Sequence, residues 1–145
     1  VDQRVGAMLE KERAAGVTTR EYYAKLQTQA ETIADELLTF LIDTAKTGKK
    51  IGAYGAAAKG NTLLNFAGVR SRLLPWVVDR NPAKQDKFLP GSRIPIVTEE
   101  RIREEKPEYI LILPWNLREE VMSQLDYVRE WGGKFVTAIP RLHIQ

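Results

Sequence analysis

The sequence predicts an α/β fold, a Rossmann-like three-layer sandwich built on a mostly parallel sheet. From Lys49 to Ile139, short apolar runs alternate with amphipathic helical segments, which is typical of strand–helix–strand units. The first run, Ile51–Tyr54, passes through a turn of small residues at Gly55–Gly60 into a helix. We expect about five strands in the order 3-2-1-4-5, preceded by a long N-terminal helix.

The N-terminal part has a different pattern from the rest. Residues 1–17 are expected to form a linker or short helix from a missing upstream domain, and residues 18–145 to form a single Rossmann-like domain. Thr18 and Glu21 have the spacing of a capping box, which predicts a helix from there to about Thr47.

The remaining elements follow from apolar runs and turn residues. Thr98 and Asn116 are each predicted to cap the start of a helix, and Gly132 to end one. Prolines at 90 and 95 keep the third strand short and place it at an edge of the sheet. Strands are predicted at 50–54, 74–79, 94–97, 108–113 and 134–139, and helices at 57–67, 98–105 and 117–131.

Composition excludes several classes of function. The 145 residues contain no cysteine and only one histidine, His143, so we expect neither disulfides nor a metal site. The formal net charge of +3 does not indicate nucleic-acid binding. No apolar run reaches the roughly 18 residues of a membrane span, and we expect a cytoplasmic protein. The chain begins with Val1 rather than Met, which we interpret as part of a longer polypeptide.

The turn at Gly55–Gly60 is the best candidate for a ligand site. A helix start offers free N–H groups to an anion, and Lys59 adds a positive charge there. In a sheet of this order, ligands bind at the carboxyl ends of the strands, where the loops 55–60 and 114–116 would meet. The spacing of Gly52, Gly55 and Gly60 differs from the dinucleotide fingerprint, which disfavours NAD.

Each candidate side chain has a structural alternative. Lys59 either binds a diphosphate or is a solvated charge, and Asp79 either accepts bonds from ribose hydroxyls or caps the Asn81–Pro82 turn. Lys84 either clamps a phosphate or is solvated, and Trp115 either stacks on a ligand or anchors its loop. The predicted substrate-binding residues are Tyr54, Gly55, Ala56, Lys59, Gly60, Asn61, Asp79, Lys84, Trp115 and Asn116.

Three segments carry a resemblance to a known family. They occur in a fixed order along the chain. The first, at 52–65, reads Gly-Ala-Tyr-Gly-Ala-Ala-Ala-Lys-Gly-Asn-Thr-Leu-Leu-Asn. The second, at 78–96, reads Val-Asp-Arg-Asn-Pro-Ala-Lys-Gln-Asp-Lys-Phe-Leu-Pro-Gly-Ser-Arg-Ile-Pro-Ile, and the third, at 107–116, reads Pro-Glu-Tyr-Ile-Leu-Ile-Leu-Pro-Trp-Asn. Together they resemble the C-terminal domain of S-adenosylmethionine (SAM)-dependent nucleotide-sugar C-methyltransferases.

The resemblance implies a substrate-side domain of a deoxysugar-biosynthesis enzyme. In that family, a zinc-binding module and a methyl-donor domain precede this one, and a ring carbon beside a ketone is methylated. It implies that a nucleotide-diphosphate sugar and the upstream domain of the same polypeptide are the partners. SAM and zinc are expected on the missing domains, with no cofactor and no catalytic residue in this chain. The resemblance implies an enzyme in the full-length C-methyltransferase and leaves open whether this chain alone is one.

Two other readings of the residues stay open. One is a non-catalytic regulatory module that binds a nucleotide or CoA, and the other is an NAD(P)-binding half-domain, which the glycine spacing disfavours. A cysteine cluster followed by a second glycine motif upstream would distinguish the methyltransferase from both.

Overall fold

The computed structural model describes residues 2–145, which divide into two compact units with the boundary after Thr32. The first unit contains α1 (Gln3–Ala14), α2 (Arg20–Tyr23) and the first turns of α3 (Leu26–Lys46). Of the two alternatives for residues 1–17, a helix is therefore present from Gln3, while Val1 lies outside the described residues.

The predicted capping box at Thr18 is wrong by one residue. Gly16 adopts a left-handed conformation, and the hydroxyl of Thr19 donates to its carbonyl over 2.7 Å. The same hydroxyl accepts from the N–H of Tyr22, so Thr19 caps the short helix α2. The predicted single helix is interrupted between Tyr23, where α2 ends, and Leu26, where α3 begins.

The second unit is built on a six-stranded sheet in the order β3-β2-β1-β4-β5-β6, which confirms the predicted order of the first five strands. Strands β1 to β5 are parallel, and β6 pairs with β5 in the antiparallel sense. The sequence did not predict β6, because its two residues are exposed and form no apolar run. The strands are β1 (Ile51–Tyr54), β2 (Val77–Val78), β3 (Ile96–Val97), β4 (Tyr109–Ile112), β5 (Lys134–Thr137) and β6 (His143–Ile144).

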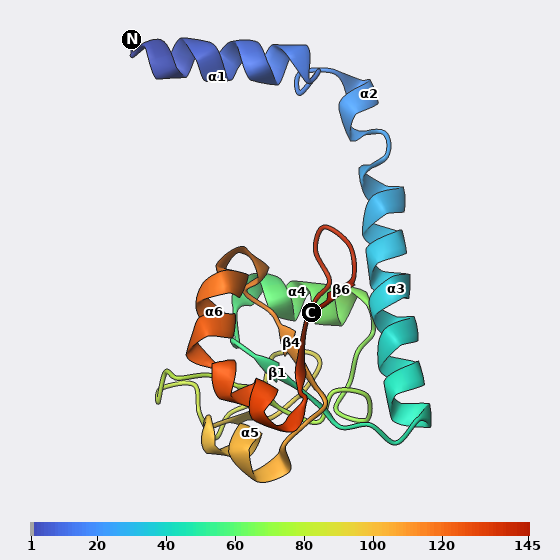
Figure 1. Cartoon of the computed structure of the whole chain (residues 1–145). Helices are drawn as coiled ribbons and strands as arrows, with labels where there is room; N and C mark the ends of the chain where they lie inside the picture. Colours follow the sequence, from blue (N-terminus) through green and yellow to red (C-terminus); the bar gives the residue numbers. More distant parts are fainter. Residues whose placement is uncertain (1) are drawn as a thin grey trace. The chain divides into compact units, whose positions relative to one another are not determined.

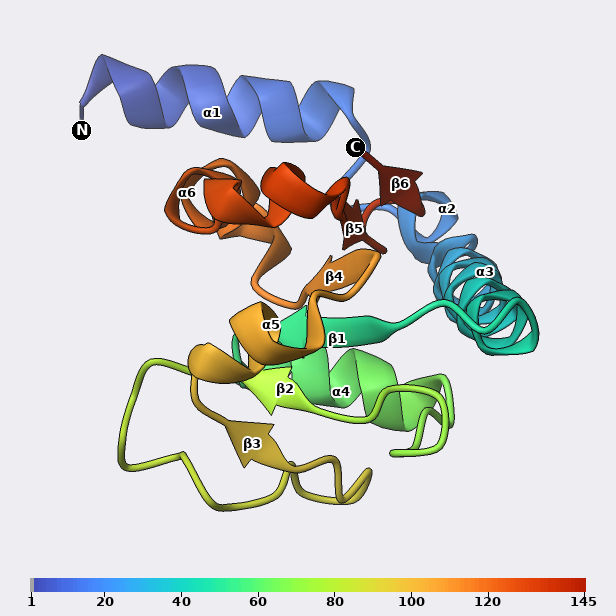
Figure 2. The ribbon, with the colours of Figure 1, turned by 60° about the horizontal axis from the view of Figure 1, so that its bottom comes forward.

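Helices cover both faces of the sheet. One face packs against α3 and α4 (Ala58–Phe66), and the other against α5 (Glu100–Glu105), α6 (Arg118–Gln124) and the 3₁₀ helix η2 (Asp126–Trp131). In Figure 1, β1 and β4 lie between α3 and α6, and Figure 2 shows β2 and β3 continuing the sheet beyond β1. This is the three-layer arrangement that the sequence predicts.

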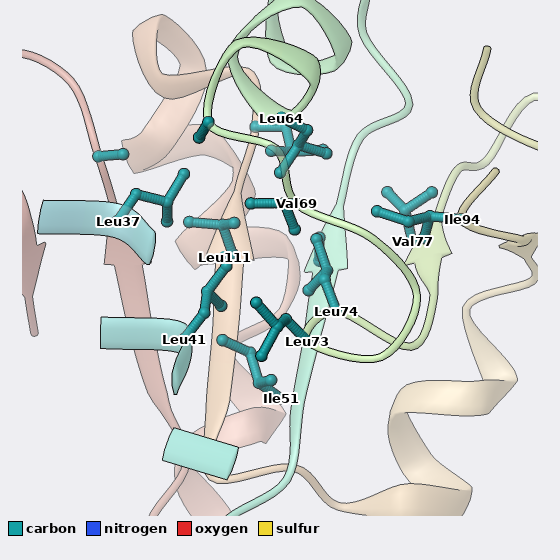
Figure 3. Packing of buried hydrophobic residues seen from close by; sticks show 14 of the residues in the cluster. Leu37, Leu41, Ile51, Leu64, Val69, Leu73, Leu74, Val77, Ile94 and Leu111 are labelled. Atoms are coloured by element: carbon teal, nitrogen blue, oxygen red, sulfur yellow. The ribbon is translucent and has the colours of Figure 1, made fainter. Parts of the chain in front are cut away.

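Alternating side chains of the strands fill two hydrophobic cores. In Figure 3, Leu37 and Leu41 extend from α3 toward Leu111 of β4 and Ile51 of β1. These leucines are fully buried, which explains why the second half of α3 is a well-packed part of this unit.

Two predicted helix boundaries in this unit also need correction. The helix predicted at 117–131 is an α-helix only to Gln124 and then continues as η2, whose geometry places Leu125 and Val128 on the same buried side. Thr98 does not cap α5, because Glu99 takes the N-cap position and makes no side-chain capping bond; the nearby Thr98 side chain lowers the pKa of the Glu100 carboxyl.

Candidate ligand-binding site

The turn between β1 and α4 requires glycine for reasons internal to the protein. Gly55 has φ +88°, and a Cβ there would lie 2.6 Å from Cδ of Pro114. A Cβ on Gly60 would lie 2.6 Å from Cβ of Leu113, at the end of β4. Both glycines thus let the turn and α4 pack closely against the chain that leaves β4, and neither needs a bound ligand to explain it.

A cavity of about 660 Å³ opens beside this turn. Its size is within the usual range of small-molecule sites, about 300–1,000 Å³, and its lining is mostly apolar, as in such sites. One wall comes from the turn and the start of α4, and the other from the loop after β2 together with β3. The lining residues are Ala56, Ala57, Ala58, Asn61, Thr62, Ala83, Lys84, Lys87, Phe88, Leu89, Pro90 and Ile96.

The start of α4 faces this cavity without a side-chain cap. Ala57 occupies the N-cap position and makes no capping hydrogen bond, so the first N–H groups of the helix have no such acceptor. The methyl side chains of Ala57 and Ala58 leave space beside them. An anion placed there would meet free N–H groups and the positive end of the helix dipole.

Lys84 and Lys87 contribute the positive charges of the opposite wall. The ammonium group of Lys84 donates to the carbonyl of Ala56 and to the carboxylate of Asp79, each over 3.0 Å. That of Lys87 donates to the carbonyl of Ala83 over 2.6 Å. Both side chains therefore have partners at the cavity, and each retains donor capacity for a ligand.

The carboxylate of Asp79 links the turn after β1 to the loop after β2. One carboxylate oxygen accepts from the N–H of Ala56 and the other from the N–H of Asn81, both over 2.9 Å. Lys84 completes the environment of the carboxylate, whose side chain is 13% exposed. The turn-capping alternative is thus present in the structure, while a bond to ribose stays a prediction.

Lys59 belongs to a second polar cluster, at the carboxyl ends of β1 and β4. Its ammonium group donates to the side-chain oxygen of Asn116 and lies 4.6 Å from the ring centroid of Trp115. The prediction that Asn116 caps the next helix is wrong, because Asn116 lies within the 3₁₀ helix η1 (Trp115–Leu117) and Leu117 takes the N-cap position. The structure brings together these three predicted residues, apart from the lining of the cavity.

Tyr54 lies on the opposite face of the sheet. Its ring is buried among α5, α6 and η2, and its hydroxyl donates to the side chain of Gln124 over 3.1 Å. Burial raises the pKa of the Tyr54 hydroxyl above its ordinary value. Tyr54 therefore supports the sheet behind the turn and does not line the cavity.

Asn61 and Asn65 occupy successive turns of α4. The amide nitrogen of Asn65 donates to the Asn61 carbonyl, the Asn61 side-chain oxygen and the Pro90 carbonyl, at 2.9, 3.1 and 2.9 Å. Asn65 thereby fastens α4 to the loop at the far side of the cavity. Of these two asparagines, Asn61 lines the cavity, and it is the one predicted to bind the substrate.

The sequence prediction did not select Ala83 or Phe88, which line the cavity. Their segment, 81–90, is rich in turn residues and has no periodic pattern that would indicate which side faces α4. Phe88 carried the clearest signal, since a large aromatic residue stands there between charged and turn residues.

Comparison with known proteins decides the family. Residues 1–140 match the family model described as the C-methyltransferase C-terminal domain. The chain belongs to this family. The resemblance seen in the sequence is therefore confirmed.

A curated relative in Streptomyces niveus is C-methyltransferase NovU. It is 32% identical to this chain over 136 residues, which are 94% of the chain and 32% of the relative. The C-methyltransferase C-terminal domain described here thus spans about a third of the length of that relative.

Residues 2–145 contain neither a helix that could span a membrane nor a cluster of metal-binding side chains. No described helix is long and apolar enough to cross a membrane. Within the same residues, no group of three or more histidine, cysteine, aspartate or glutamate side chains is arranged to hold a metal ion.

Proposed function

We propose that this C-methyltransferase C-terminal domain holds a nucleotide-linked keto-deoxysugar for methylation by the upstream domain of the same polypeptide. The observation that carries the proposal is the 660 Å³ cavity at the carboxyl ends of β1 and β2, bordered by the uncapped start of α4. Ligands of doubly wound sheets bind at this end of the strands.

The chemistry of the cavity suits a nucleoside diphosphate. The helix start and the ammonium groups of Lys84 and Lys87 favour phosphate oxygens, and the apolar lining favours a ring. The sugar would extend from the diphosphate toward the upstream domain. Lys59, beside Trp115, is a further positive charge at this end of the sheet.

The domain would contribute positioning to the reaction. In the proposed chemistry, a base removes the proton beside the ketone, and the resulting enolate carbon attacks the methyl group of SAM, whose sulfur leaves as the thioether. We place the base, SAM and the zinc module in the upstream domains, and no catalytic residue in this chain. Holding the sugar at a fixed orientation lowers the entropic part of the barrier.

The proposal is tested with the full-length protein and nucleoside diphosphates as probes. Titration calorimetry should show binding of a thymidine or uridine diphosphate without SAM, and a double substitution Lys84→Ala and Lys87→Ala should weaken it. Methyl transfer to a nucleotide-linked keto-deoxysugar should be lost in parallel. Full-length protein that binds no nucleoside diphosphate at millimolar concentration contradicts the proposal.

The two alternatives are tested in the same titration. A regulatory module would bind CoA or a free nucleotide without any effect of the double substitution on methyl transfer. An NAD(P) half-domain would bind NAD more tightly than a nucleoside diphosphate, and the packing of Gly55 and Gly60 against Pro114 and Leu113 does not favour it.

A further inference from the structure

Phe88 is an aromatic residue whose side chain is exposed to solvent at the cavity. It lines the cavity and is nevertheless 60% exposed. Its neighbours Leu89 and Ile94 are almost completely buried, so apolar side chains of this segment can reach the core. The exposure of Phe88 is therefore specific to this residue and is not shared by the whole segment.

The backbone around Phe88 is held firmly. The N–H of Asp86 donates to the carbonyl of Ile96 over 3.0 Å, and that of Ile96 to the carbonyl of Lys87 over 2.8 Å. Phe88 itself forms an antiparallel bridge with Pro95, and the N–H of Leu89 donates to the carbonyl of Ile94 over 2.9 Å. Because these bonds tie the segment to the edge strand β3, the ring is presented at a fixed place on the cavity rim.

The wall across the cavity carries a polar group of defined orientation. Asn65 donates to the backbone carbonyls of Asn61 and Pro90, so its amide nitrogen must face them. The side-chain oxygen of Asn61 then accepts from the same nitrogen. This leaves the amide nitrogen of Asn61, within the described part of the chain, as a hydrogen-bond donor available to a ligand.

We propose that Phe88 is the stacking surface for the nucleobase of the ligand, with the amide of Asn61 donating to a carbonyl of the base. This inference rests on the proposed function and adds which part of the ligand the cavity takes. A planar base would cover the exposed ring face, and stacking of this kind tolerates different bases because each has a π-face. The phosphates would then lie toward Lys84, Lys87 and the start of α4.

The test compares ligands with and without a base on variants of Phe88 in the full-length protein. Uridine diphosphate is titrated beside inorganic pyrophosphate and ribose 5-phosphate. Phe88→Ala should weaken uridine diphosphate by about 5- to 150-fold, the usual effect of losing one stacked base, and leave the two baseless probes unchanged. Phe88→Trp should restore the affinity, and nuclear Overhauser effects should join the ring protons of Phe88 to those of uracil.

Phe66→Ala is the matched control, because Phe66 is a 53% exposed phenylalanine on α4 that does not line the cavity. It should leave the affinity for uridine diphosphate unchanged. If wild-type protein binds uridine diphosphate and Phe88→Ala binds it equally well, the stacking inference fails while the proposed function stands. If Phe88→Ala weakens all three probes alike, or lowers methyl transfer without affecting any of them, Phe88 has a structural or interdomain role and the inference is wrong.

Discussion

The ammonium group of Lys59 is held by the loop that follows β4. It donates to Asn116 and lies over the ring of Trp115, and both contacts would compete with a bound diphosphate for the same charge. A positive charge that already has protein partners can still bind phosphate, since an ammonium group has three donors.

Lys59→Ala should therefore have two measurable effects. We expect nucleoside diphosphate binding to weaken by about 1–3 kcal/mol, as for a lost charge-assisted hydrogen bond, and the free energy of unfolding to fall by about 1 kcal/mol or less through the lost contact with Trp115. Calorimetry and urea denaturation measure these effects, and Lys59→Arg, which keeps the charge, is the control. Unchanged affinity together with reduced stability would show that Lys59 only anchors its loop.

Asp79 is the second residue whose role the structure sharpens. Its carboxylate ties together the backbones of two loops and the ammonium group of Lys84. Asp79→Asn should lower the free energy of unfolding by about 1–3 kcal/mol, because hydrogen bonds to a charged group are lost. Because both cavity walls would shift, pyrophosphate and nucleoside diphosphate should lose affinity alike. Selective loss of ribose-containing ligands, with normal thermal stability, would instead support ribose binding by Asp79.

At the scale of elements, the packing of α4 on the end of β4 depends on Gly60. Gly60→Ala would place a methyl group 2.6 Å from Cβ of Leu113, and the resulting overpacking should destabilise the sheet domain by about 1–3 kcal/mol. Gly6→Ala is a matched control, because Gly6 is also helical and has open space around it. Urea denaturation should leave the sheet domain of Gly6→Ala unchanged. Equal stability of both variants would mean that α4 can move away from β4 without cost.

The helices on the opposite face are joined by a cluster of hydrogen-bonded side chains. Glu99 accepts from Arg80 over 2.9 Å and from the hydroxyl of Tyr127 over 3.1 Å. Burial, together with the nearby Glu99 carboxylate, raises the pKa of the Tyr127 hydroxyl. The cluster links the loop after β2 with the start of α5 and with η2.

This raised pKa predicts how stability depends on pH. Above about pH 10, the ordinary pKa of tyrosine, the unfolded chain releases the Tyr127 proton more readily than the folded chain, so unfolding becomes more favourable. The stabilisation is fully present below pH 10 and is lost as pH rises toward the folded pKa. Chemical denaturation at pH 9 and pH 11 should show the decrease, and Tyr127→Phe should reduce it. A variant with the same pH dependence as the wild type would assign the effect to other groups.

At the scale of the whole molecule, the described residues contain one glycine-containing strand–turn–helix, whose cavity we assign to the nucleotide sugar. We therefore expect the chain by itself not to bind SAM. Calorimetric titration should show no heat of binding, while the full-length protein should bind SAM. A micromolar complex of the chain alone would overturn the proposed division between substrate and methyl-donor domains.

The sequence by itself determined the family, the order of the first five strands and the end of the sheet at which the glycine turn lies. These properties follow from local patterns: alternation of apolar runs and helices, and small residues where the chain turns. Its errors lie where a distant contact, or a turn in the neighbouring backbone, outweighs the local signal. Asparagine is a common helix cap, but the side chain of Asn116 accepts a hydrogen bond from Lys59 instead. Thr19 rather than Thr18 caps α2, because the chain turns at Gly16.

Only the tertiary structure decided which candidate side chains share a site. Tyr54 and Ala56 are two residues apart, yet Tyr54 packs on the opposite face while Ala56 lines the cavity. Phe88 and Asn61 line the same cavity for two reasons. Backbone hydrogen bonds hold the segment of Phe88 against β3, and Asn65 fastens that segment to α4. The physical reason is that a binding cavity is made by segments distant in sequence, and local preferences of the chain do not specify how such segments meet.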